Sequence, residues 1–92
     1  MVKKKNKKII IIGTNSFSAG SLINYLLSKK YRIYGISRSK MNQKKFLRFD
    51  PNNKNFSFKK LDLNKEHNKI VNLIKRTKPR YIVNFASQSM VA

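Results

Sequence analysis

Residues 8–22 read KIIIIGTNSFSAGSL, an apolar run that ends at Gly13 and passes through small residues into an amphipathic segment. The isoleucines, with no polar residue between them, predict a strand covered on both faces, as in parallel sheets. Asn15 or Ser16 can cap a helix that begins directly after the turn. In α/β proteins, a pyrophosphate binds backbone N–H groups at such a helix N-terminus. The segment therefore predicts a phosphate-binding turn.

The rest of the chain continues to alternate between strand and helix patterns. Strands are predicted at residues 8–12, 31–37, 56–61 and 80–85, and helices at residues 16–29 and 65–77. This order predicts an α/β fold, a Rossmann-type parallel sheet of about four strands in the order 3-2-1-4 with flanking helices. The 92 residues suffice for one small domain. We expect residues 1–92 to form a partial, truncated dinucleotide-binding domain with a basic tail at residues 1–7.

Several residues carry more detailed expectations about these segments. Helical spacing places Phe17 on the buried face of the first helix, and Asn64 is expected to cap the second helix. Pro79 is expected to end that second helix. Asp50 and Pro51 open a turn in the irregular region between the second and third strands. Three apolar side chains are expected to anchor this region on the core: Phe46, Leu47 and Phe49.

The chain is strongly basic, with 22 lysines and arginines against three acidic residues and a net charge of +19. Clustered basic residues bind nucleic acid, so a basic nucleic-acid-binding module is one alternative. Such a module would expose aromatic residues beside the bases of residues 56–60. The basic residues are spread along the sequence, however, and a buried third strand accounts better for Phe56 and Phe58. Nucleic-acid binding is therefore not favoured as the main role.

The composition argues against several other classes of protein. Because the chain has no cysteine, it has neither disulfides nor thiolate metal ligands. His67 is the single histidine and is expected to be exposed, so no metal site is predicted. No apolar run approaches the roughly 18 residues that a membrane helix needs. We expect no membrane partner and a cytoplasmic location.

The turn after the first strand resembles that of a known enzyme family. Gly13-x-x-Ser16-x-x-Ala19 is similar to the Gly-x-x-Gly-x-x-Gly turn of the extended short-chain dehydrogenase/reductase family, with two glycines replaced by small residues. That family includes nucleotide-sugar epimerases and 4,6-dehydratases. The resemblance implies a dinucleotide bound by five turn residues: Gly13, Asn15, Ser16, Phe17 and Ser18. For the turn alone, an ordinary strand–turn–helix without a ligand is the alternative.

The second strand bears on the choice of cofactor. Residues 32–39 resemble the second strand of the same family, particularly in GDP-mannose 4,6-dehydratase-like members, where the end of the strand contacts the adenosine ribose. A site for NAD carries an acidic residue roughly 20 residues beyond the glycines. Here no acid occurs between Gly13 and Asp50, and Arg38 stands in that region. An arginine accommodates a 2′-phosphate, so NADP is favoured over NAD. The alternative is that Arg38 is an ordinary surface residue.

Two later segments extend the resemblance over nearly all of the chain. Asp62 and Leu63 resemble the Asp-Leu pair after the family's third strand, where the aspartate accepts a hydrogen bond from the adenine amino group. Phe85, Ala86 and Ser87 resemble the segment after the fourth strand, where small residues let the backbone approach the ribose and nicotinamide. For Asp62, the alternative is an aspartate that only stabilises a turn beside the predicted cap. For residues 85–87, the alternative is an ordinary strand end.

The resemblance implies an NAD(P)-dependent nucleotide-sugar 4,6-dehydratase or epimerase, with a nucleotide-sugar substrate and a homo-oligomeric full-length form. The family's catalytic Tyr-x-x-x-Lys pair lies beyond the fourth strand. Tyr25 and Lys29 have this spacing but fall within the first helix, where the family places no catalysis. We therefore expect no catalytic residue in this chain, which would be the N-terminal cofactor-binding part of the enzyme. A non-catalytic Rossmann remnant is the other alternative.

Overall fold

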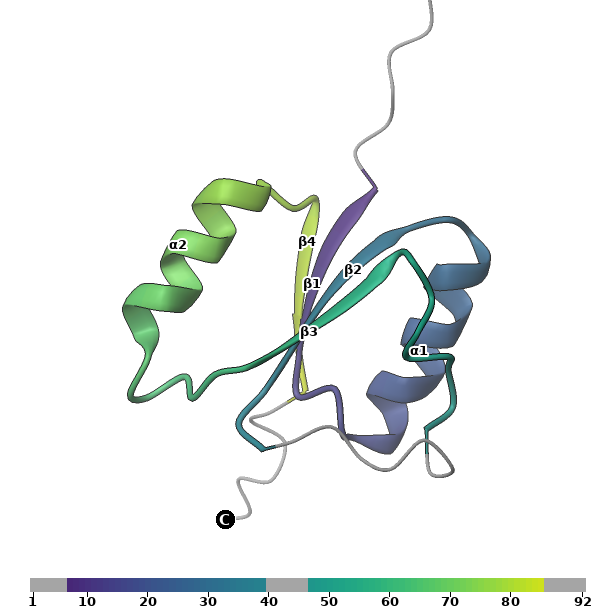
Figure 1. Ribbon diagram of the computed structural model, residues 1–92, viewed down its shortest axis with the longest axis horizontal. Coiled ribbons are helices and arrows are strands. Elements are labelled where there is room, and N and C mark those ends of the chain that lie inside the picture. Colours follow the sequence, from purple (N-terminus) through teal and green to yellow (C-terminus); the bar gives the residue numbers. More distant parts are fainter. Residues whose placement is uncertain (1–6, 40–46, 86–92) are drawn as a thin grey trace, which may run out of the picture.

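The computed structural model, which describes residues 7–39 and 47–85, is a parallel sheet with a helix on each face (Figure 1). Its elements are β1 (Lys8–Ile12), α1 (Phe17–Ser28), β2 (Arg32–Ser37), β3 (Phe56–Lys60), α2 (His67–Thr77) and β4 (Tyr81–Asn84). The sheet order is β3-β2-β1-β4, and every pair of neighbouring strands is parallel. The predicted Rossmann-type order 3-2-1-4 is confirmed.

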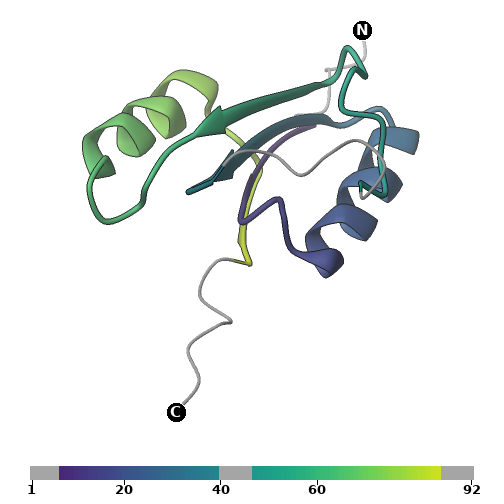
Figure 2. The same ribbon diagram turned by 60° about the horizontal axis from the view of Figure 1, so that its bottom comes forward.

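The isoleucines of β1 explain why both faces of the sheet are covered. Alternate side chains of a strand point to opposite faces. Ile9 and Ile11 pack in the cluster that includes α1, whereas Ile10 and Ile12 pack in the cluster that includes α2. Figure 2 shows the two helices on opposite sides of the sheet. Since β1 is central and buried on both faces, its segment has no polar alternation.

Helix α1 begins as predicted, but its first side chain lies elsewhere than expected. Ser16 is the N-cap, and its hydroxyl oxygen accepts a hydrogen bond from the Ala19 N–H at 3.2 Å. Phe17, predicted to be buried, is 69% exposed. Helical periodicity gives the direction of a side chain around the helix axis but not where the core ends along that axis, and the Phe17 ring centroid lies 3.8 Å from the guanidinium of the exposed Arg48. The prediction for the Phe17 side chain was therefore wrong.

Helix α2 begins later than predicted, because a turn precedes it. The side chain of Asp62 accepts a hydrogen bond from the Asn64 N–H at 2.8 Å, and the Asp62 carbonyl accepts one from the Glu66 N–H at 2.7 Å. These bonds hold residues 62–66 in a turn, so the helix starts at His67 and Asn64 is not its cap. Its last residue is Thr77, two positions before Pro79, as expected.

The described part of the β2–β3 connection is anchored by aromatic packing. Phe49 is buried, and its ring centroid lies 4.8 Å from that of Phe56. Leu47 packs against the same cluster, while Phe46 lies outside the described residues. Phe56 is buried and Phe58 is half-buried against this cluster, so β3 lacks the exposed aromatic face expected of the nucleic-acid-binding alternative. Neither helix of the described ranges is long and apolar enough to cross a membrane.

Candidate functional site

The parallel sheet gathers most of the predicted cofactor residues at one edge. Because all strands run in the same direction, their carboxyl ends lie together, at Ile12, Ser37, Lys60 and Asn84. From β1 the chain passes to α1 on one face, whereas α2 on the other face leads into β4 (Figure 1). The boundary between β1 and β4 is thus a topological switch point, where open α/β sheets bind ligands.

Gly13 shapes the turn that follows β1. Its φ is 86°, a conformation that L side chains rarely adopt. Its N–H donates to the Ile36 carbonyl at 2.7 Å, and its own carbonyl accepts from the Ser16 N–H at 3.1 Å. The amides of Gly13 and Ser16 are therefore engaged within the protein. We therefore expect Gly13 and Ser16 to contribute to cofactor binding through the shape of the turn and the Ser16 hydroxyl, and not through their own N–H groups.

Two adjacent amides at the start of α1 remain available for a ligand. The Ala19 N–H is capped by the Ser16 hydroxyl, and the Gly20 N–H donates to the Ser16 carbonyl at 3.1 Å. Within the described part of the chain, the N–H groups of Phe17 and Ser18 have no protein acceptor. They lie at the positive end of the helix dipole, where an anionic oxygen is stabilised. We call this pair of amides the phosphate cradle, because the sequence predicts that the turn binds a pyrophosphate.

Asn15 connects the phosphate cradle to the end of β2. Its side-chain amide donates to the hydroxyl oxygens of Ser37 at 3.3 Å and Ser39 at 3.1 Å. Arg38, the residue predicted to contact a 2′-phosphate, lies between these two serines and is exposed. The structure therefore brings the turn and the end of the second strand together.

Asp62 and Phe85 follow the ends of β3 and β4. The Leu61 N–H donates to the Ser37 carbonyl at 2.9 Å, which holds the segment of Asp62 beside the end of β2. Asp62 itself stabilises the turn before α2, as the alternative of a turn aspartate predicted. A contact of Asp62 with adenine stays a prediction. Leu63 packs against the α2-side cluster. The Phe85 N–H donates to the Ile12 carbonyl at 2.8 Å, beside the start of the turn.

The structure adds little about the remaining candidate residues. Ala86 and Ser87 lie outside the described residues. The Lys29 ammonium lies 5.6 Å from the centroid of the Tyr25 ring, at the end of α1 that is remote from the cradle. Among the described residues, no group of three potential metal-ligating side chains comes together.

Two residues near the cradle were missed by the sequence analysis. Thr14 is 1% exposed, and its hydroxyl oxygen has no hydrogen-bond partner in the described part of the chain. The Arg48 guanidinium lies 3.8 Å from the centroid of the Phe17 ring and adds a cation beside the first turn of α1. Arg48 lies in an irregular segment, where no periodicity marks such a contact. The polarity of Thr14 directly after a buried strand was the only available signal for that residue.

Comparison with known proteins gives relatives of this fold. The Bordetella bronchiseptica enzyme WbmH, solved in complex with NAD+, superposes with a TM-score of 0.72 and 22% identity over 89% of this chain and 26% of its own. For dTDP-glucose 4,6-dehydratase from Bacillus anthracis, in complex with NAD, the TM-score is 0.73 and the identity 21%, over 90% of this chain and 27% of its own. UDP-glucose 4-epimerase from Thermotoga maritima, with UDP-glucose, has a TM-score of 0.68 and 17% identity, over 89% and 25% of the two chains.

These likenesses show the fold, and the chain spans only about a quarter of the length of these proteins. No match was found among curated protein sequences. A family model described as GDP-mannose 4,6 dehydratase matches residues 10–92, from within β1 to the last residue given. The match covers most of the chain and confirms the resemblance to nucleotide-sugar dehydratases and epimerases of the extended short-chain family. The chain belongs to the GDP-mannose 4,6-dehydratase family.

Proposed function

We propose that this chain forms the pyrophosphate- and adenosine-binding part of the cofactor site in an NAD(P)-dependent nucleotide-sugar dehydratase or epimerase. The observation that carries the proposal is the pair of amides at Phe17 and Ser18, which have no protein acceptor and lie at a helix N-terminus at the switch point of the sheet. The family match supports the same assignment. So do the titles of two solved structures with this fold, which name NAD or NAD+ as bound.

The residues at the edge of the sheet fit a dinucleotide. The amides of Phe17 and Ser18 would donate to the pyrophosphate oxygens, and the Ser16 hydroxyl can donate its hydrogen to the same group while its oxygen caps α1. Asp62 and Leu63 would contact the adenine, and the segment at residues 85–87 would approach the ribose and nicotinamide. When bound, the nicotinamide supplies the hydride acceptor for oxidation of the sugar. The proposal assigns no catalytic residue to this chain.

The proposal favours NADP over NAD, because of the residue that follows β2. Arg38 is exposed at this strand end, and the sequence has no acid between Gly13 and Asp50 to contact a 2′-hydroxyl there. A guanidinium forms paired hydrogen bonds with a phosphate, and Arg38 would thereby select the 2′-phosphate. The solved structures with this fold include NAD+ complexes, so the choice of cofactor depends on this chain's own residues.

Calorimetric titration with NADP+ and with NAD+ tests both parts of the proposal. We expect tighter binding of NADP+, a loss of that preference in Arg38→Asp, and a loss of binding of both cofactors in Gly13→Val, whose side chain cannot occupy a φ of 86° without strain. Lys54→Asp is the matched control, because it makes the same charge change at another exposed residue. If neither cofactor binds, the proposed function fails, and if Arg38→Asp keeps the preference, the assignment to NADP fails.

The whole protein's properties belong to the same proposal. Its substrate would be a nucleotide-linked sugar, oxidised at C4 and then dehydrated or epimerised, and its full-length form would be a cytoplasmic homo-oligomer. The family match and the fold support this class of reaction.

A further inference from the structure

A shallow groove lies on the α2 face of the sheet, away from the phosphate cradle. It has a volume of about 90 Å³ and is lined by residues of β2, β3 and α2: Tyr34, Gly35, Ser57, Lys59, Leu73 and Arg76. None of these is a predicted cofactor residue, and Tyr34 pairs with Ile10 and with Ser57 over the middle of the strands, while Lys59 lies one position before the end of β3. It is therefore separate from the candidate cofactor site.

The groove exists because α2 covers only part of its face of the sheet. Ile70 and Leu73 of α2 pack with Ile10, Ile12 and Ile36, over β1 and the end of β2. The helix leaves Tyr34, on β2, and Ser57, on the edge strand β3, only half-buried. Open space remains between Arg76, on the outer side of α2, and the strand β3.

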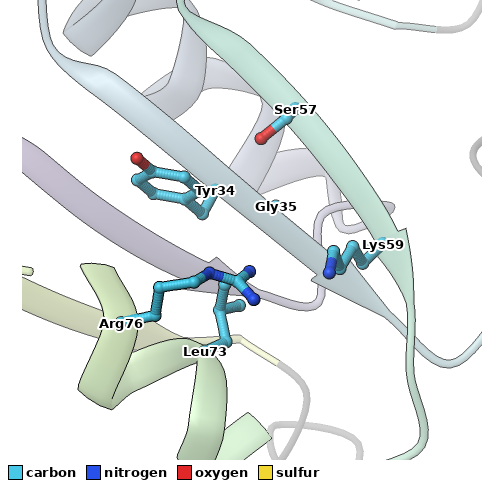
Figure 3. A pocket seen from close by; sticks show the side chains of 6 residues that line it. All are labelled: Tyr34, Gly35, Ser57, Lys59, Leu73 and Arg76. Carbon is cyan, nitrogen blue, oxygen red and sulfur yellow. The ribbon is translucent and has the colours of Figure 1, made fainter. Parts of the chain in front are cut away.

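Two cations enter this groove from opposite sides without a carboxylate between them. Figure 3 shows the Lys59 ammonium and the Arg76 guanidinium both directed into the space above Gly35. In the part of the chain that the structure describes, the single ion pair joins Lys69 to Glu66, so neither groove cation has an acidic partner there. Like charges that face each other across a groove repel, and an anion between them removes this cost.

The other lining groups indicate which anion fits. The Ser57 hydroxyl is directed toward the same space and adds a neutral donor (Figure 3). Arg76 can form paired hydrogen bonds with two oxygens of one phosphate, and Lys59 adds a point charge. The Tyr34 ring and Leu73 supply apolar walls, against which a small organic group can pack. We propose that this groove is a second anion site, which binds a phosphate monoester.

Titration of the ¹⁵N-labelled chain by NMR tests this proposal, with inorganic phosphate and phenyl phosphate as the probes. At about 0.15 M salt, where the Debye length is about 8 Å, we expect saturable shifts of the Gly35 and Ser57 amide signals. Lys59→Met/Arg76→Met should weaken binding at least about tenfold, because charge-assisted hydrogen bonds to the phosphate are lost. Tighter binding of phenyl phosphate than of inorganic phosphate supports the proposal. Equal binding of the two would overturn the assignment to a phosphate monoester, because the site would then hold the free ion.

The matched control is Lys54→Met/Lys75→Met, which removes two charges from exposed residues that do not line the groove. This control should bind the probes within about twofold of the unmodified chain. Equal losses in both double variants would show unspecific attraction by the net charge and overturn the proposal, as would an absence of saturable shifts at Gly35 and Ser57. Displacement of phenyl phosphate by a far tighter-binding oligouridylate would also overturn it, in favour of nucleic acid. Unchanged circular dichroism of each variant ensures that a loss of binding reports on the groove.

Discussion

At the scale of single residues, Thr14 carries an energetic cost beside the phosphate cradle. Its hydroxyl oxygen is buried and has no partner among the described residues. An unsatisfied buried hydroxyl costs about 1–3 kcal/mol, and an apolar group of the same shape avoids this cost. We expect Thr14→Val to raise the free energy of unfolding by about 1 kcal/mol, measured by urea denaturation. A drop in stability would instead mean that the hydroxyl has a partner in the folded protein.

Gly35 marks a close approach between β2 and the turn. A β-carbon at this position would lie 2.8 Å from the Thr14 methyl carbon and 3.0 Å from the nearest atom of the Phe56 ring. Forcing a methyl group into such a space costs about 1–3 kcal/mol. We predict that Gly35→Ala lowers the free energy of unfolding by this amount, again measured in urea.

A double-mutant cycle with Thr14→Ser provides the control for Gly35→Ala, because serine lacks the methyl group that would clash. The loss of stability caused by Gly35→Ala should be smaller in the Thr14→Ser background. Equal losses in both backgrounds would contradict a contact between residue 35 and the turn.

At the scale of elements, the turn before α2 depends on Glu66. One carboxylate oxygen of Glu66 accepts from the Asp62 N–H at 3.0 Å, and the other lies 3.1 Å from the Lys69 ammonium. The hydrogen bond from the Asp62 backbone, and then that from Lys69, lower the pKa of Glu66 below its ordinary value. A carboxyl with a lowered pKa stabilises the fold at neutral pH, and this contribution is lost as the pH falls through the lowered pKa.

We therefore predict a pH-dependent difference between the unmodified chain and Glu66→Gln. The unmodified chain should melt at the higher temperature near neutral pH, and the gap between the two melting temperatures should shrink at acid pH, as the pH falls through the lowered pKa of Glu66 and the carboxylate becomes protonated. Thermal melts over a pH series measure this difference in melting temperature. Asp50→Asn is the control, because it neutralises a carboxylate in another turn. A gap that stays constant from neutral to acid pH would contradict a role for the Glu66 charge.

The elements differ in how far the sequence could predict them. The run from Ile9 to Ile12 specified a central strand, because only a strand buried on both faces tolerates such a run. The start of α2 was missed, since the bond from the Asn64 N–H to the Asp62 side chain competes with helix capping at that point. The contact of Arg48 with Phe17 depends on the path of an irregular segment, which local patterns do not describe.

For the candidate site, the sequence predicted which strand ends come together but not which amides stay free. The spacing around Gly13 and Ser16 predicted a phosphate turn. In the folded protein, the amides of these two residues are engaged within the protein, whereas those of Phe17 and Ser18 have no protein acceptor in the described chain. Such hydrogen bonds depend on the backbone of β2 as well as that of the turn.

At the scale of the whole molecule, the net charge of +19 opposes folding. At an ionic strength of about 0.01 M the Debye length is about 30 Å, which exceeds the radius of gyration of about 12 Å expected for a domain of this size. All charges then repel one another, whereas at about 0.15 M the Debye length falls to about 8 Å. We predict that sodium chloride raises the melting temperature over this range. An uncharged osmolyte at equal osmolarity is the control, and an equal rise with the osmolyte would contradict the electrostatic cause.

The outer edge of β4 gives this charge a second consequence. Among the described strands, β4 pairs only with β1, and its Tyr81 and Ile82 are 52% and 45% exposed. An open strand edge with apolar side chains is a template on which another copy can add. Mutual repulsion between copies counteracts this addition, so the same lysines that weaken each domain also keep the domains dispersed. Added salt, which stabilises each folded domain by screening its charges, would therefore also weaken the repulsion between copies and favour their self-association.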